Sequence, residues 1–108
     1  MIDDATIAKA VESLLQAVPG GKVILFGSYA RGDADEGSDV DLLVIEPEVS
    51  DNFKEMLRLR GSLRHLRISV DVLVASQRHF EYWVDTPGTI YHEAALEGKV
   101  FEALPRAS

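Results

Sequence analysis

Two aspartates, Asp39 and Asp41, open an apolar segment, and an earlier apolar segment ends directly before Gly27 and Ser28. Side chains two positions apart on a strand point to the same face, about 7 Å apart along it. Both carboxylates are therefore expected to project together beside the Gly-Ser turn. At a separation of about 5 Å and an effective dielectric constant near 20, their repulsion costs roughly 3 kcal/mol. A bound cation, a shared proton or open water would relieve that repulsion.

The Gly-Ser turn offers what a phosphate group needs. Glycine lets the backbone approach an anion closely, and Ser28 can begin a helix whose N–H groups face that anion. Arg31 could stabilise negative charge on a phosphate. The alternative for this arginine is a surface ion pair with Asp33 or Asp35, and the sequence does not choose between the two. The carboxylates can bind a metal ion, and the amides beside them can bind a phosphate. Together they indicate a site for a metal-bound nucleotide.

A third aspartate, Asp71, lies inside the apolar segment 68–74. Alternation along a strand turns its side chain away from the valines at positions 70, 72 and 74, which we expect in the core. These aspartates could be no more than strand-end and turn residues. Aspartate is depleted in strands, however, so three of them in or at the start of apolar segments favour a functional interpretation.

The arrangement of Gly27-Ser28, ten residues and then Asp39-x-Asp41 resembles the signature of the minimal nucleotidyltransferases. This family is a branch of the DNA polymerase β-like nucleotidyltransferase superfamily. Asp71 fits the place of the third acidic residue that the family carries on a later strand. A motif of this length followed by a strand with one aspartate is far more specific than a glycine motif alone.

The resemblance covers residues 22–75 well and the rest of the chain loosely. The stretches 27–32 and 38–43 are similar to the family in detail. One departure is Tyr29, where many relatives carry arginine, and it bears on the phosphate contacts.

The resemblance implies that two divalent ions, usually Mg²⁺, hold the triphosphate of ATP and activate an attacking hydroxyl. The first two aspartates would bridge both ions, and the third would hold the ion nearer the acceptor. The turn would bind the nucleotide phosphates. The implied catalytic and metal-binding residues are Asp39, Asp41 and Asp71, and the implied nucleotide-binding residues are Gly27, Ser28 and Arg31.

The resemblance also implies a function, the transfer of AMP from Mg-ATP to a hydroxyl with release of pyrophosphate. Small members of the family resemble MntA-type antitoxins, which are paired with a HEPN-domain toxin and adenylylate a tyrosine of it. We therefore expect a toxin–antitoxin hetero-oligomer. Two alternatives stay open: a non-catalytic antitoxin that neutralises the toxin by binding, and a nucleotidyltransferase that acts on a small molecule or an RNA end.

Composition sets the limits of this interpretation. A chain of 108 residues predicts one domain, 1–108. The net charge of −7 argues against general nucleic-acid binding, which depends on neutralising phosphates. The absence of cysteine excludes disulfides and cysteine-based zinc sites. Without a leader or an apolar run of about 20 residues, the expectation is a cytoplasmic protein outside the membrane.

Hydrophobic periodicity and turn residues predict a small α/β fold. We expect a mixed sheet with helices packed mainly on one face, and the resemblance implies a nucleotidyltransferase core like the palm of polymerase β. The predicted helices are 3–18, a short turn at 28–31, 51–67 with a weak point at 61–62, 76–84 and 86–97. The predicted strands are 22–26, 39–45 and 68–74, and residues 99–104 could add a last strand or pack across the domain.

Three arginines, Arg60, Arg64 and Arg67, fall on one stripe of the predicted helix 51–67. They could bind an acidic partner or a nucleotide. The alternative is a solvated face near a helix C-terminus, where positive charge is favourable.

Overall fold

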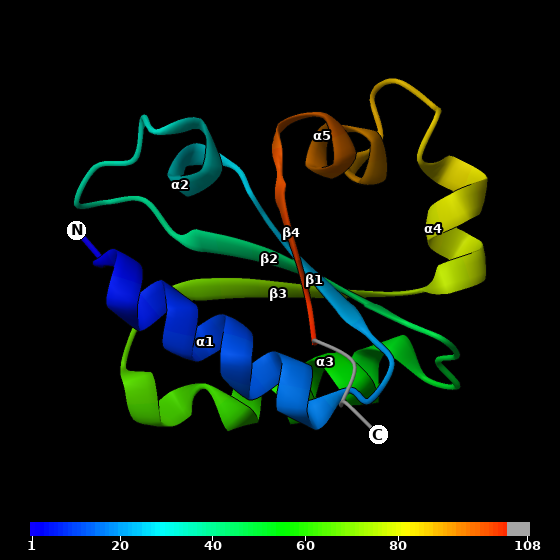
Figure 1. The fold of residues 1–108 in the computed structure, drawn as a ribbon, viewed down its shortest axis with the longest axis horizontal. Coiled ribbons are helices and arrows are strands. Elements are labelled where there is room, and N and C mark those ends of the chain that lie inside the picture. Colours follow the sequence, from blue (N-terminus) through cyan, green and yellow to red (C-terminus); the bar gives the residue numbers. More distant parts are fainter. Residues whose placement is uncertain (104–108) are drawn as a thin grey trace.

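The computed structural model describes residues 1–103, in which four strands form one mixed sheet with helices on both of its faces (Figure 1). The predicted α/β fold is therefore confirmed. In chain order the elements are α1 (Asp4–Ala17), β1 (Lys22–Phe26), α2 (Ser28–Arg31), β2 (Val40–Glu46), α3 (Asn52–Ser62), the 3-10 helix η1 (Arg64–Leu66), β3 (Val70–Ser76), α4 (Gln77–Trp83), α5 (Ile90–Glu97) and β4 (Lys99–Glu102).

The strand order is β3-β2-β1-β4. β1 runs antiparallel to both β2 and β4, whereas β2 and β3 are parallel. Parallel neighbours need a crossover, and α3 with η1 supplies it. This topology brings the end of β1 and the starts of β2 and β3 to the same end of the sheet.

The central strands are buried on both faces, which explains why they read as nearly continuous apolar runs. In β1, Val23 and Leu25 join the core formed with α1 and α3. Ile24 and Phe26 join a smaller cluster on the other face, together with Ala94 of α5. The two central strands therefore have one face toward α1 and α3 and one face toward α4 and α5.

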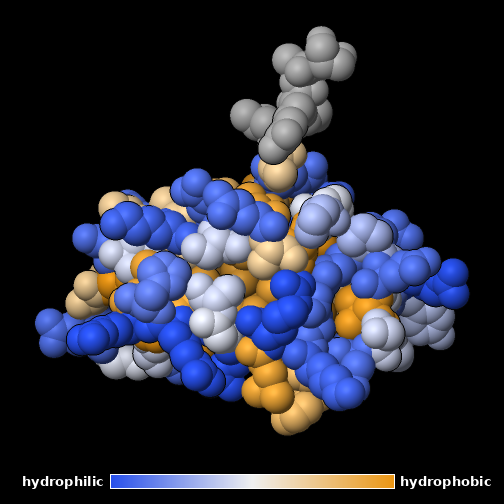
Figure 2. Space-filling model, turned by 90° about the horizontal axis from the view of Figure 1, so that it is seen from below, coloured by the Kyte–Doolittle hydropathy of each residue, from blue (hydrophilic) through white to orange (hydrophobic). Residues whose placement is uncertain are grey.

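The layering differs in one respect from the arrangement expected from the sequence. The two longest helices, α1 and α3, cover one face as predicted, and α4 and α5 lie over the other face as well (Figure 1). Short helices carry too little periodicity to reveal which face they cover. Seen from the side of α1 and α3, the outer surface is mainly hydrophilic with scattered apolar side chains (Figure 2), as amphipathic helices require.

Several helices and strands begin or end at residues other than those predicted. The helix predicted over 51–67 ends at Ser62, at the predicted weak point, and η1 follows. The third strand lies at Val70–Ser76 instead of 68–74. The last helix begins at Ile90 and not at residue 86, because the Thr89 hydroxyl caps it by accepting the N–H of His92 at 3.2 Å.

The last strand is formed at Lys99–Glu102, and residue 104 of the predicted segment lies outside the described residues. No helix within residues 1–103 is long and apolar enough to cross a membrane.

Candidate active site

Asp41 and Asp71 lie side by side at one end of the sheet. The register pairs Phe26 of β1 with Asp41 of β2, and Asp41 with Asp71 of β3. Paired residues on neighbouring strands, which lie about 4.8 Å apart, project to the same face. The two carboxylates therefore share the face that α5 covers, as the strand alternation in the sequence predicted for Asp71.

Asp41 is the more enclosed of the two, since its side chain is partly buried whereas Asp71 is exposed. Burial raises the pKa of the Asp41 carboxyl, and the negative charges of Asp71 and Asp39 raise that pKa further. Arg31 acts in the opposite direction. The site thus concentrates negative charge that a cation would relieve.

Asp39 precedes β2 and accepts a short hydrogen bond from the hydroxyl of Ser69, which precedes β3. The N–H of Val40 donates to the carbonyl of Ser69 at 3.0 Å. These two bonds tie the starts of β2 and β3 together. The Asp39 carboxylate thus contacts Ser69, and its negative charge acts on Asp41 as well.

The site offers carboxylate ligands for a metal ion, but the side chains alone do not form a full coordination shell. Among residues 1–103, no group of three or more His, Cys, Asp or Glu side chains is arranged to hold a metal ion. Mg²⁺ is usually bound through one or two carboxylates together with phosphate and water oxygens. The carboxylates of Asp41 and Asp71, at paired positions of adjacent strands, fit that requirement.

Gly27 connects β1 to α2 and lies against Asp41. Its backbone has φ 76° and ψ −157°, a conformation that residues with a side chain avoid. A Cβ atom built on Gly27 would overlap the carboxylate of Asp41. Glycine is therefore required here both for the turn and for the close approach of the turn to the carboxylate.

Ser28 begins α2, so the N–H groups of Ser28 and Tyr29 have no acceptor within the helix. The N–H groups of Ala30 and Arg31 both donate to the carbonyl of Gly27 at 3.0 Å. Within residues 1–103, the turn thus presents donors without an intrahelical acceptor next to Gly27, which lies against Asp41. Whether Gly27, Ser28 and Arg31 bind a nucleotide stays a prediction.

Arg31 forms two ion pairs. Its Nε lies 3.3 Å from Oδ2 of Asp33, and its Nη1 lies 3.1 Å from Oε1 of Glu97. The first is the local pair that the sequence offered as one of two alternatives. The second comes from the end of α5 and was not predicted.

Glu97 is the site residue that sequence reasoning missed. Its Oε1 also accepts the N–H of Gly27 at 3.1 Å, so one carboxylate oxygen contacts both ends of α2. The only local signal was its position directly before the helix-ending Gly98.

All three arginines of the stripe, Arg60, Arg64 and Arg67, are exposed, and their role stays a prediction. Two hollows flank Asp71, of about 520 Å³ and about 340 Å³, and both are lined by Arg60 and Asp71. Arg64 lines the first of them, whereas Arg67 lines a separate hollow. The stripe is therefore divided: Arg60 lines both hollows beside Asp71, whereas Arg67 lines neither of them.

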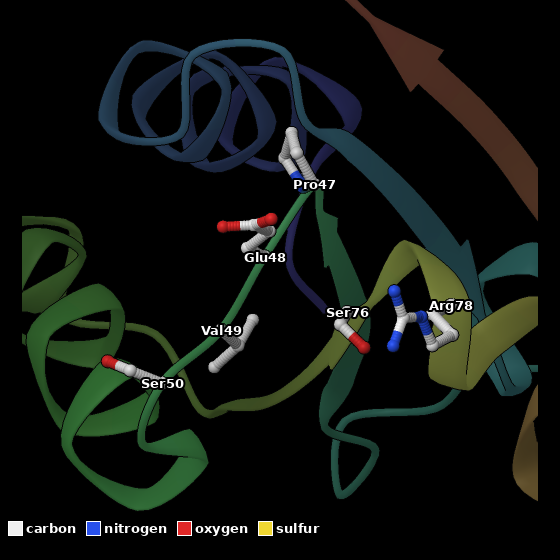
Figure 3. Close-up of a pocket in the computed structure, with 6 residues that line it drawn as sticks. All are labelled: Pro47, Glu48, Val49, Ser50, Ser76 and Arg78. Carbon is white, nitrogen blue, oxygen red and sulfur yellow. The ribbon is translucent and has the colours of Figure 1, made fainter.

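A further hollow of about 550 Å³ lies at the opposite ends of β2 and β3 (Figure 3). Its lining contains none of the predicted site residues. It consists of residues 47–50 together with Ser76 and Arg78. This hollow and the predicted site are therefore different places on this protein.

A mixed sheet that brings a Gly-Ser turn onto carboxylates of two adjacent strands has the architecture of a nucleotidyltransferase core. Comparison with known families agrees with this class. The model of the family described as "Nucleotidyltransferase domain" matches residues 6–102, so this chain belongs to that family. The family predicted from the Gly-Ser and aspartate motif is thereby confirmed.

Two relatives from Methanocaldococcus jannaschii are similar over part of the chain. "Putative protein adenylyltransferase MJ0141" is 43% identical over 54 residues, which is 50% of this chain and 54% of that protein. "Putative protein adenylyltransferase MJ0604" is 45% identical over 47 residues, 42% of this chain and 47% of that protein. The matches thus span about half the length of these relatives.

Solved structures share the fold. A toxin–antitoxin structure with AMP-PNP superposes with a TM-score of 0.62 at 21% identity, covering 94% of this chain and 75% of that chain. A mutant of the toxin–antitoxin MntA-HpeT gives 0.61 at 20% identity over the same shares. A structure described as a "putative nucleotidyltransferase" from Sulfolobus solfataricus gives 0.54 at 26% identity, covering 72% and 70%.

Proposed function

We propose that this protein transfers AMP from ATP to a hydroxyl group of a partner protein and releases pyrophosphate. The observation that carries the proposal is the direct pairing of Asp41 with Asp71, next to the turn that Gly27 and Ser28 form. Carboxylates beside free amide donors suit a metal-bound triphosphate.

The choice of a nucleotide and of a protein acceptor rests on the relatives. Two of them are named as protein adenylyltransferases, and a structural neighbour was crystallised with the ATP analogue AMP-PNP. Structural neighbours are also toxin–antitoxin proteins. We therefore propose that the acceptor is the hydroxyl group of a tyrosine in a HEPN-domain toxin. This toxin would form a hetero-oligomer with this chain.

In the proposed reaction, the acceptor oxygen attacks the α-phosphorus of ATP. The new bond joins that oxygen to phosphorus, and the bond between the α-phosphorus and the oxygen that bridges to the β-phosphate breaks. The hydroxyl proton passes to the exposed carboxylate of Asp71 and then to solvent. The products are an AMP–acceptor phosphodiester and pyrophosphate.

Asp41 and Asp71 would hold Mg²⁺, and Asp39 would join them by turning from its hydrogen bond with Ser69. When bound, Mg²⁺ would neutralise the charge that develops on the attacking and leaving oxygens. The close carboxylates and the raised pKa of Asp41, caused by burial and by Asp71, fit a site that gains from a cation. Ser28 and the amides at the start of α2 would bind the β- and γ-phosphates, and Arg31 would add positive charge beside them.

The test uses ATP labelled at the α-phosphorus, with Mg²⁺ and the purified toxin partner as the acceptor. We expect label on the partner with the wild type and none with the Asp39→Asn/Asp41→Asn double variant. The double variant Glu12→Gln/Glu48→Gln is the control, because it removes the same number of charges at exposed positions, one on α1 and one after the far end of β2.

An unlabelled partner that the wild type nevertheless binds and silences would contradict the proposal and favour an antitoxin that acts by docking. Label on a small molecule or an RNA end instead of the partner would keep the transfer chemistry and overturn the acceptor.

A further inference from the structure

Glu97 makes two long-range hydrogen bonds with one oxygen. Its Oε1 accepts the N–H of Gly27, 70 residues away in the chain, and Nη1 of Arg31, 66 residues away, both at 3.1 Å. Gly27 precedes α2 and Arg31 ends it. A single carboxylate from the end of α5 therefore holds both ends of the short helix that carries the predicted phosphate-binding donors.

The position of Glu97 depends on a close approach of α5 to the sheet. A Cβ atom on Gly98 would overlap the carbonyl of Ala94 and the side chain of Ile24, and would lie 3.0 Å from the carbonyl of Leu25. Only glycine leaves room for this contact. The chain then enters β4, where Lys99 pairs with Leu25 of β1. Glu97 is thereby fixed beside the residue that follows β1.

The turn needs such an anchor. Gly27 adopts a conformation with positive φ, and its carbonyl is engaged by the N–H groups of Ala30 and Arg31. With Glu97 accepting its N–H, both polar groups of Gly27 are held. Without the hydrogen bond from Gly27 to Glu97, the turn would be free to rotate away from Asp41. The two are in close contact, since a Cβ atom on Gly27 would overlap the Asp41 carboxylate.

We propose that Glu97 is a positioning residue that fixes the Gly27–Arg31 turn against Asp41, so that its amides bind the triphosphate. The inference deepens the proposed function and rests on it. Glu97 does not touch the reacting atoms; it acts through Gly27 and Arg31. Its side chain is 27% exposed, so the contact is sheltered but not closed off from solvent.

The first experiment tests the contact without any activity. Amide hydrogen exchange of the ¹⁵N-labelled full chain is measured for the wild type, Glu97→Ala, Glu97→Gln and Glu93→Ala. Loss of a hydrogen bond to a charged acceptor is expected to speed exchange at Gly27 roughly tenfold in Glu97→Ala. Glutamine keeps an acceptor oxygen, so Glu97→Gln is expected to retain most of the protection.

Glu93→Ala is the matched control, because Glu93 is exposed and lies one turn earlier on α5. It is expected to leave Gly27 unchanged. Amides in the centre of β1 and β2 report the overall fold, so a variant that fails to fold is recognised at once. Unchanged exchange at Gly27 in Glu97→Ala would overturn the inference.

The second experiment measures Mg-ATP affinity and transfer with the toxin partner. Glu97→Ala is expected to raise the KM for ATP roughly tenfold with a smaller fall in kcat, because the turn binds the phosphates in the ground state and the transition state alike. Glu97→Gln is expected to restore the KM to near the wild-type value.

Tighter ATP binding by Glu97→Ala would overturn the inference, since Glu97 would then be a competitor that occupies the place of a phosphate. A wild type that neither binds ATP nor transfers AMP would overturn the proposed function, while the exchange data would still decide whether Glu97 holds the turn.

Discussion

Asp41 on β2 is paired directly with Asp71 on the parallel strand β3. Because side chains alternate along a strand, a slip of one residue would move Asp71 to the face of α1 and α3. The valines at positions 70, 72 and 74 belong to the core on that face, so their burial sets the register. The packing of the core thus places the two carboxylates together despite their repulsion.

Replacing Asp71 with Asn is expected to lower the rate of AMP transfer by at least the factor of about 10²–10³ that follows loss of one electrostatic group. The fold should not be weakened, since the change removes one of two neighbouring negative charges. Transfer rates and urea unfolding of the same samples test both parts. A rate within tenfold of the wild type would exclude an essential role for Asp71.

Gly27→Ala is expected to destabilise the protein by roughly 1–3 kcal/mol and to abolish transfer, because alanine is strained at φ 76° and its Cβ would displace Asp41. Gly61→Ala is the control. Gly61 lies in α3 with open space at the Cβ position, so alanine there should stabilise by about 0.5–1 kcal/mol. Equal effects of the two substitutions in chemical unfolding would contradict this account of the turn.

The carboxylates and the turn could be predicted because their signals are local. Strand alternation placed Asp71 opposite the valines, and the short spacing between Gly27 and Asp41 joins two adjacent antiparallel strands. Each inference needed only the residues of one strand or one turn. The roles of these residues in metal and nucleotide binding are still predictions.

Glu97 could not be predicted, because its contact depends on how α5 is placed on the sheet. That placement follows from the missing side chain of Gly98, and the sequence shows only a helix-ending glycine. Arg60 was left undecided for a similar reason. Its helix ends at Ser62 instead of continuing to residue 67, and this end separates the surroundings of Arg60 from those of Arg67.

Arg60→Ala is expected to lower the transfer of AMP to the protein acceptor while the affinity for Mg-ATP changes little. Arg60 lines both hollows beside Asp71, the residue proposed to take the proton of the acceptor hydroxyl. Arg78→Ala is the control, since Arg78 is exposed at the opposite end of β3 (Figure 3). A rise in KM for the toxin partner supports the acceptor role; a rise in KM for ATP alone would assign Arg60 to the nucleotide.

Glu46 is a buried carboxyl at the end of β2, far along that strand from Asp41. Its side chain is 8% exposed. Burial raises the pKa of Glu46, and the neighbouring Glu55 carboxylate adds to this effect, so that together they bring the pKa to about 7. The opposite shift occurs at Glu55, where pairing with Arg58 lowers the pKa to about 2. Glu46 therefore carries the proton of this pair near neutral pH.

Because folding raises the pKa of Glu46, the folded state binds more protons than the unfolded state between about pH 4.5 and pH 7. This contribution to stability is fully present below pH 4.5 and is lost as the pH rises through 7. We expect Glu46→Gln, which stays neutral, to remove that loss. The contribution of Glu55 has the opposite sign and falls in a lower window, between about pH 2 and pH 4.5, so it does not mask the effect. Urea unfolding at pH 5 and pH 8 tests this pH dependence, with the exposed Glu48→Gln as the control. An equal loss of stability in the wild type and Glu46→Gln would show that another group is responsible.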